Sequence, residues 1–423
     1  MGKNQCVERS QFSSGEVPLT EQTQGRRLAL VLCRCMSLLA AAALGGWLCA
    51  CSTPYATPSF ATNQGNDVSF GGVAAKLTAG SALDIVLVHG MCTHDGTWAT
   101  QAVASLYSAL GGDPSAVQLA PANVPNSPII LYQQTLPVRD ANLRVNAVVW
   151  SPVTTPLKAA LCYDQTNKPA TCPATEAQKS YPYKRASLNR ILKDQILDDC
   201  LSDAVIYQGR ARDEINKQMQ TALLQAVATS GGSRLPGPSE AASLAERAAR
   251  QPAGLPLIFV TESLGSKVTF DALYKLLQTA SGREAATRTL QRTTQVFMAA
   301  NQMPILALAD TTPDGTLEAA PAGYPADALG AAFRAISPAG LESTSQHVPD
   351  VIAFTDPSDV LSYILAPSRH AQQAGYRVVD VIVSNDTTYL GLVELPNNAH
   401  LGYLSNPVVK KLIVCGHTNQ SCP

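Results

Sequence analysis

The sequence predicts a mixed α/β fold in which a mostly parallel, doubly wound sheet is flanked by helices. Three observations lead to this prediction. Short runs of apolar residues, typical of strands buried on both faces, alternate with segments whose apolar residues recur at helical spacing. No internal repeat is present, so the alternation describes one sheet rather than a repeat array. Of the 423 residues, 46% are hydrophobic and 15% are charged, which provides enough apolar side chains for a large core.

The charge and the motif content argue against several classes of function. The net charge is −1, without the basic stripe that nucleic-acid binding needs, so no nucleic acid is expected as a partner. The chain also lacks a P-loop, a His-Glu-x-x-His motif and paired Cys-x-x-Cys motifs. We therefore predict no cofactor and no metal ion.

The N-terminal segment reads as a secretory signal. Arg26 and Arg27 provide a positive flank, and residues 36–48 form a short apolar core. A transmembrane anchor is the alternative, but Arg34 interrupts the apolar stretch before it reaches the length of a membrane-spanning helix. The polar stretch before Arg26 is long for a signal, so the true start codon stays open.

The end of this segment, Leu48-Cys-Ala-Cys51, resembles the lipobox of bacterial lipoproteins. The resemblance implies that residues 1–50 are a lipoprotein signal peptide and that Cys51 becomes the lipidated first residue. Ser52 after it would favour the outer membrane of a Gram-negative bacterium. The partner implied is therefore a membrane, reached through a lipid anchor on Cys51.

After the signal, the chain divides into a tether and one large domain. Residues 51–80 are rich in Pro, Thr, Asn and Gly and are predicted to be a tether, and residues 81–423 form the domain. Two Pro-rich insertions, near residues 151–186 and 301–349, are expected to form caps at the edge of the sheet. Strands are predicted at residues 84–90, 145–150, 257–262, 296–300, 351–354 and 378–383. Helices are predicted at residues 188–227, 239–250, 326–336 and 407–414 and directly after Ser263.

The segment around Ser263 organises the prediction of function. The apolar run of residues 257–260 leads to Ser263 and Gly265, and a helix with apolar residues four apart follows. Ser263 therefore lies on a sharp strand-to-helix turn, as in a nucleophile elbow. Thr261 stands where that motif has glycine, and threonine fits such a tight turn less easily.

Four features together resemble the α/β-hydrolase superfamily over residues 83–416. They are His89-Gly90 after an early strand, Ser263 after a later one, an acid after the next strands, and a late histidine. The resemblance implies an α/β-hydrolase fold with Ser263 as nucleophile, Asp359 as the orienting acid and His400, in a loop after the last strand, as the base. Asp356 is the alternative acid, although an Asp before Pro also suits a turn.

The other histidines are assigned lesser roles. His370 precedes the last strand and His417 lies in the C-terminal tail, so we expect both on the surface. His89 is expected to shape its loop rather than to react. The family also implies that the oxyanion is bound by the backbone N–H groups of Leu264 and Met91.

This arrangement predicts a serine hydrolase of carboxylic esters, acting on a small ester or lipid through an acyl-enzyme. An acyltransferase or thioesterase uses the same three residues and stays an alternative. A catalytically silent envelope lipoprotein that binds a lipid or another ligand is the second, and Thr261 is its best support. The natural substrate, the oligomeric state and the membrane leaflet are not predicted.

Six cysteines follow Cys51, which fits an exported protein with as many as three disulfides among fifteen connectivities. We favour the two local pairs, Cys162 with Cys172 and Cys415 with Cys422, which leaves Cys92 with Cys200. Buried free thiols are the alternative.

Overall fold

The structure is a computed structural model that describes residues 51–228, 241–252, 254–313, 323–336, 349–368 and 376–418. The chain divides into a small and a large compact unit. The described part of the small unit is Cys51–Ser52 together with residues 388–393, and the large unit contains the rest. The predicted signal peptide, residues 1–50, lies outside the described residues, as does His370.

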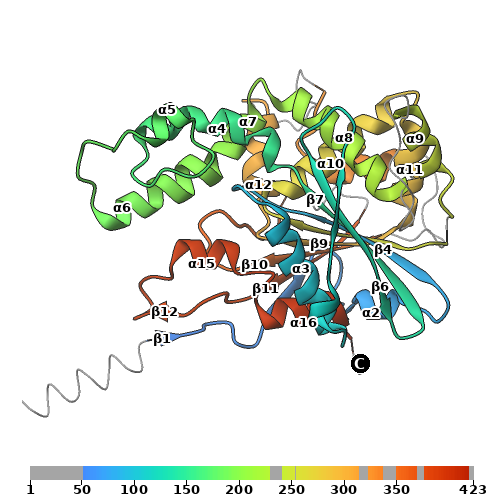
Figure 1. The fold of residues 1–423 in the computed structure, drawn as a ribbon. Coiled ribbons are helices and arrows are strands. Elements are labelled where there is room, and N and C mark those ends of the chain that lie inside the picture. Colours follow the sequence, from blue (N-terminus) through green and yellow to red (C-terminus); the bar gives the residue numbers. More distant parts are fainter. Residues whose placement is uncertain are drawn as a thin grey trace, which may run out of the picture. The chain divides into compact units, whose positions relative to one another are not determined.

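The large unit is built on a mixed sheet, whose nine strands among the described residues follow the order β2-β11-β10-β9-β8-β4-β7-β6-β5 (Figure 1). The six neighbouring strands from β11 to β7 are parallel. At the two edges, β2 pairs antiparallel with β11, β6 with β7, and β5 with β6. Their bounds are β2 (Ser59–Thr62), β4 (Ala82–Val88), β5 (Ala120–Asn123), β6 (Ile130–Val138), β7 (Ala141–Val149), β8 (Leu257–Glu262), β9 (Thr293–Ala299), β10 (Asp350–Thr355) and β11 (Arg377–Ile382). The prediction of a mixed α/β fold with a mostly parallel sheet is confirmed.

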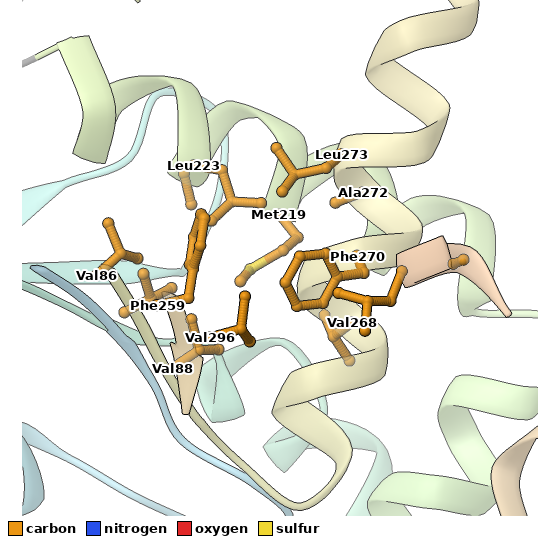
Figure 2. Packing of buried hydrophobic residues seen from close by; sticks show 14 of the residues in the cluster. Val86, Val88, Met219, Leu223, Phe259, Val268, Phe270, Ala272, Leu273 and Val296 are labelled. Carbon is orange, nitrogen blue, oxygen red and sulfur yellow. The ribbon is translucent and has the colours of Figure 1, made fainter. Parts of the chain in front are cut away.

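Helices cover both faces of this sheet (Figure 1). One layer contains α8 (Arg212–Ala228), α9 (Ala241–Ala249), α10 (Leu264–Gln278), α11 (Arg283–Arg292) and α13 (Ala328–Ile336). The other contains α2 (Val73–Lys76), α3 (Gly96–Ala109) and α16 (Pro407–Cys415). Alternation along each strand divides the core between them: Val86 and Val88 of β4 face the first layer, whereas Ile85 and Leu87 face the second. Figure 2 shows the first layer, where Phe259 of β8 meets Met219 and Leu223 of α8.

All six predicted strands are present as the six parallel strands of the sheet. They were predicted from continuous apolar runs, and the structure buries these strands along nearly their whole length. The β5–β6 hairpin was not predicted. Its strands lie at the sheet edge and carry alternating, partly exposed polar residues such as Gln133 and Gln134. An isolated stretch of that kind is hard to distinguish from a loop.

The segment predicted as a tether contributes to the large unit. Ser59–Thr62 form the edge strand β2, which pairs antiparallel with β11, and the Thr62 hydroxyl donates to the carbonyl of Val378 at 2.7 Å. This part of residues 51–80 is therefore not a free linker. Composition indicated a linker because four residues with alternating burial are too short to stand out from the Pro- and Asn-containing sequence around them.

The first insertion is helical and continues to residue 208. It contains η2 (Ser151–Val153), α4 (Thr155–Lys158), η3 (Ala159–Asp164), α5 (Ala174–Ala177), α6 (Ser187–Ile191), η4 (Leu192–Leu201) and α7 (Ser202–Gln208). The single helix predicted over residues 188–227 is interrupted at Gly209, where the chain turns from α7 into α8. The second insertion begins with α12 (Met303–Leu306) and η5 (Ala307–Asp310) and leads to α13, which confirms the helix predicted at residues 326–336. Residues 314–322 and 337–348 of that insertion lie outside the described residues.

Two of the three predicted disulfides are confirmed. Cys162 is bonded to Cys172 inside the first insertion, and Cys92 is bonded to Cys200, which joins the loop after β4 to the end of η4. The third predicted pair includes Cys422, which lies outside the described residues. In the part of the chain that the structure describes, no helix is both long and apolar enough to cross a bilayer.

Candidate active site

Ser263 occupies a strained turn between β8 and α10. Its backbone has φ 51° and ψ −126°, a conformation that only glycine adopts at low cost, and its N–H donates to the carbonyl of Ala299 at 2.8 Å. The side chain is 3% exposed, and its hydroxyl has no hydrogen-bond partner among the described residues. The sharp strand-to-helix turn at Ser263 is the one that the sequence predicted.

Two glycines allow the backbone to close around Ser263. A methyl group on Gly90 would lie 2.6 Å from the Cβ of Ser263, so the loop after β4 packs directly against the serine. A methyl group on Gly265 would overlap the carbonyl oxygen of His89. Glycine is therefore required at both positions, and the loop that carries Met91 lies against the elbow.

Thr261 is accommodated without a glycine at its position. Its side chain is fully buried, and its hydroxyl lies 2.8 Å from that of Ser266 in the first turn of α10. The hydroxyl of a buried threonine needs such a partner, and Ser266 provides it. The departure from the elbow motif therefore adds a strand-to-helix hydrogen bond.

His400 and Asp359 are brought together, as predicted. Nδ1 of His400 lies 3.0 Å from each carboxylate oxygen of Asp359. A carboxylate can only accept, so Nδ1 carries the proton and Nε2 is left as the acceptor in the neutral ring. His400 belongs to a short helix, α15 (Pro396–Leu401), which corrects the prediction of a loop. Proline at the first turn starts that helix without losing a hydrogen bond.

Asp359 is held by two further donors that the sequence did not reveal. The Tyr403 hydroxyl donates to Oδ2 at 3.0 Å, and the backbone N–H of Leu361 donates to Oδ1 at 3.0 Å. Tyr403 also accepts from the backbone N–H of Asp356 at 2.8 Å and is 1% exposed. This tyrosine therefore joins the loop that carries the acid to the segment that carries His400.

Asp356, the alternative acid, has a different role. Its carboxylate accepts from the N–H of Asn385 at 2.6 Å and from that of Ser358 at 2.9 Å, so it joins the ends of β10 and β11. Burial raises the pKa of Asp356, although the N–H groups of Asn385 and Ser358 lower it in part. Burial and the neighbouring Asp356 carboxyl raise the pKa of Glu394 to about 7. The structure brings Asp359, and not Asp356, to His400.

Glu262, directly before Ser263, is a site residue that the sequence analysis missed. Its half-buried carboxylate accepts from the Trp98 indole N–H at 2.9 Å. Burial raises the pKa of Glu262 to about 7, and the nearby His400 counteracts part of that rise. The hydrogen bond from the Trp98 indole N–H also lowers this pKa and is the larger of the two opposing effects.

The loop after β4 is organised by His89, as predicted. The ring is fully buried, Nε2 accepts from the N–H groups of Trp150 at 2.9 Å and Ser151 at 3.1 Å, and Nδ1 donates to the carbonyl of Gly90 at 2.8 Å. Burial lowers the pKa of His89 well below its usual value, so the ring stays neutral. His89 therefore sets the path of the chain into Met91 and has no nitrogen left for proton transfer.

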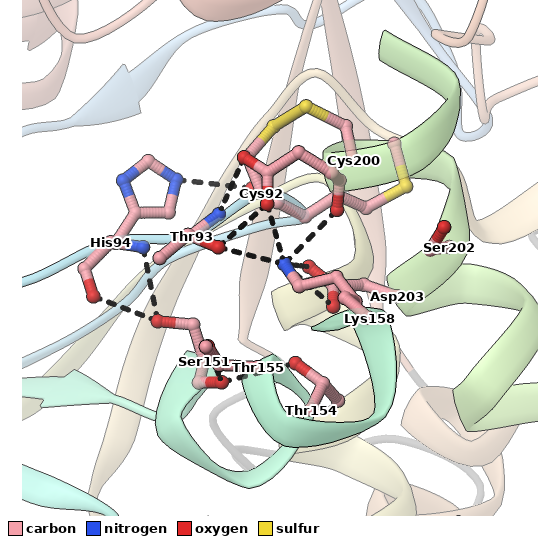
Figure 3. Close-up of polar contacts among 12 residues, drawn as sticks. Cys92, Thr93, His94, Ser151, Thr154, Thr155, Lys158, Cys200, Ser202 and Asp203 are labelled. Carbon is pink, nitrogen blue, oxygen red and sulfur yellow. Dashed lines mark hydrogen bonds and ion pairs between the residues drawn. A yellow bond between two sulfur atoms is a disulfide. The ribbon is translucent and has the colours of Figure 1, made fainter. Parts of the chain in front are cut away.

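Figure 3 shows how the first insertion holds the other end of this loop. Beside the disulfide of Cys92, the Thr93 hydroxyl donates to Asp199 at 2.6 Å. Lys158 binds Thr93 at 3.0 Å, Asp199 at 2.8 Å and the fully buried Asp203 at 3.2 Å. Burial nevertheless raises the pKa of Asp203 to about 6. Covalent and ionic contacts thus fix the residues that follow the predicted oxyanion donor Met91.

The remaining candidates lie away from this site. His417 stacks on Phe60 with ring centroids 4.0 Å apart and contacts the carbonyl of Val68, which is a structural role. A cavity of about 440 Å³ in the first insertion is lined by residues between Thr93 and Asp199 and not by Ser263. Cys92, Asp199 and Cys200 combine metal-ligand types, but the two sulfurs are bonded to each other.

Comparison of the chain with models of known protein families, with curated proteins and with solved structures found no significant match. The site is therefore interpreted from its own geometry.

Proposed function

We propose that this chain is a serine hydrolase of carboxylic esters with an α/β-hydrolase fold and a Ser263–His400–Asp359 triad. The observation that carries the proposal is the pairing of two features: a strained serine with an unused hydroxyl, and a histidine oriented by a carboxylate through Nδ1. A structural serine needs neither.

The topology supports bringing these groups to one place. β8 and β10 are parallel strands separated by β9, so their carboxyl ends lie at the same edge of the sheet. Ser263 follows β8, and Asp359 follows β10. β4 ends at this edge as well and is followed by Gly90 and Met91. Sites of parallel sheets are found at such an edge.

In the proposed reaction, Ser263 Oγ attacks the ester carbonyl carbon while His400 Nε2 takes the hydroxyl proton. The negative charge on the carbonyl oxygen is stabilised by the N–H groups of Leu264 and Met91. Leu264 is the first residue of α10, where an N–H has no acceptor inside the helix. His400 then protonates the departing alcohol. A water gives its proton to His400 as it attacks the acyl carbon, and His400 returns that proton to Ser263 Oγ when the bond to the acid breaks.

The catalytically silent binding lipoprotein remains the second candidate, because Ser263 is only 3% exposed. Acyl transfer and thioester cleavage would use the same groups. The lipid anchor on Cys51 and the outer-membrane location also stay predictions.

Turnover of p-nitrophenyl esters of increasing chain length tests the proposal. Wild type should release p-nitrophenol, and Ser263→Ala and His400→Ala should each lose at least about 10³-fold in kcat while remaining folded. A wild type with no turnover of any ester, thioester or amide would favour the binding protein.

A further inference from the structure

The small unit carries an apolar turn beside the predicted lipid attachment point. Residues 388–393 have the sequence Thr-Tyr-Leu-Gly-Leu-Val and contain no charged residue. Four of their side chains are largely exposed: Tyr389 at 45%, Leu390 at 53%, Leu392 at 84% and Val393 at 52%. Four neighbouring apolar side chains exposed on a single turn call for a partner, whereas single exposed ones do not.

The turn is a defined hairpin. The N–H of Tyr389 donates to the carbonyl of Val393 at 2.8 Å, and the N–H of Leu392 donates to that of Tyr389 at 3.0 Å. Leu390 and Gly391 both have positive φ, 55° and 64°, which is the pattern of a type I′ turn. Leucine is unusual at such a position. Its side chain is thereby held at the tip of the hairpin.

The register connects this hairpin to Cys51. β1 (Cys51–Ser52) pairs antiparallel with β12 (Thr388–Tyr389), and Cys51 is the cross-strand partner of Tyr389. The Thr388 hydroxyl donates to the carbonyl of Ser52 at 3.1 Å. Side chains of directly opposed residues lie about 5 Å apart. Acyl chains on Cys51 would therefore enter the bilayer next to Tyr389.

We infer that the hairpin of residues 388–393 is a membrane-contact surface that inserts into the interface of the bilayer holding the Cys51 anchor. The inference rests on the predicted lipid at Cys51 and is independent of the proposed hydrolase activity. A lipid surface suits an uncharged leucine-rich tip, and tyrosine is favoured at the level of the headgroups. Buried apolar side chains of this kind would add to the membrane affinity that the acyl chains provide.

Fluorescence quenching by bromine on lipid acyl chains tests the inference. Leu392→Trp is introduced into the full chain, produced in a Gram-negative host and mixed with phosphatidylethanolamine–phosphatidylglycerol vesicles with or without bromine. Asp140→Trp is the matched control, because Asp140 lies on the exposed turn of the β6–β7 hairpin in the large unit. Leu390→Trp provides a second probe at the same tip.

We expect the added fluorescence at positions 392 and 390 to be lost with brominated lipid and that at position 140 to be unchanged. No loss at the tip, or an equal loss at position 140, would overturn the inference. A blue shift of the tryptophan emission that grows with protein concentration in the absence of vesicles would show that the turn binds a second copy of the chain. That result would also overturn the inference. The mass of the Cys51 peptide reports the lipid separately, and ester turnover reports the proposed activity separately.

Discussion

Nδ1 of His400 lies 3.0 Å from both carboxylate oxygens of Asp359, although 41 residues separate the two in the chain. The contact fixes the tautomer in which Nε2 accepts a proton. Asp359→Asn would present an amide N–H to the ring and favour the wrong tautomer. We expect its kcat on a p-nitrophenyl ester to fall by about 10³- to 10⁴-fold. Asp356→Asn should lose much less, and the reverse order would make Asp356 the orienting acid.

The backbone strain at Ser263 should lower the free energy of unfolding by a measurable amount. Its φ of 51° suits glycine, whereas a Cβ at this position costs about 1 kcal/mol or more. We therefore predict that Ser263→Gly unfolds at higher urea concentration than Ser263→Ala, while both are inactive. Equal midpoints for the two variants would show that the turn is not strained.

Glu262 should make stability depend on pH. Its pKa is about 7 in the folded protein against 4.5 as the ordinary value, so the folded state binds the proton more tightly. This stabilisation is fully present below about pH 4.5 and is lost as pH rises through about 7. The melting temperature of wild type minus that of Glu262→Gln should therefore fall between those two pH values. A flat difference would mean that the Glu262 carboxyl titrates normally.

The Cys92–Cys200 disulfide should matter more than its local counterpart. It spans 108 residues and holds the loop of Met91, whereas Cys162–Cys172 spans 10 residues inside the insertion. Replacing Cys92 and Cys200 by alanine should cost about 2–5 kcal/mol in the free energy of unfolding and lower kcat. The matched Cys162 and Cys172 double variant should largely retain kcat. Equal kcat in the two double variants would show that the Cys92–Cys200 disulfide does not position the Met91 loop for catalysis.

Lys158 should contribute far more to the free energy of unfolding than an exposed lysine does. It is 6% exposed and faces Asp203, which is fully buried, so Lys158→Ala leaves a buried carboxyl without its cation. We expect a loss of about 3–5 kcal/mol in the free energy of unfolding, measured in urea at pH 7. Lys179→Ala is the control, because its pair with Glu176 is on the surface. That variant should lose less than about 1 kcal/mol.

The parts that sequence predicted are those with strong local signals. The parallel strands were found because both of their faces are buried. The contact between Asp359 and His400 was expected because each follows a predicted strand in a familiar order. In the sequence, Gly90 and Gly265 were recognised only as parts of motifs. Their close approach to neighbouring residues is visible only in the folded structure.

Other features depend on contacts between distant segments. Tyr403 reaches Asp359 from 44 residues away, and Trp98 reaches Glu262 from 164 residues away. Neither pair leaves a pattern in the sequence near it. The edge strand β2 gains its identity only from pairing with β11, so composition alone indicated a linker.

The most direct test of the central claim is covalent labelling with a fluorophosphonate, which reacts with activated serines. The account predicts that the probe modifies the folded wild type at Ser263, located by mass spectrometry of the peptide that contains it. It also predicts that Ser263→Ala is unlabelled and that His400→Ala is labelled far more slowly. A folded wild type that resists the probe, or that carries it on another serine, would contradict the proposed triad.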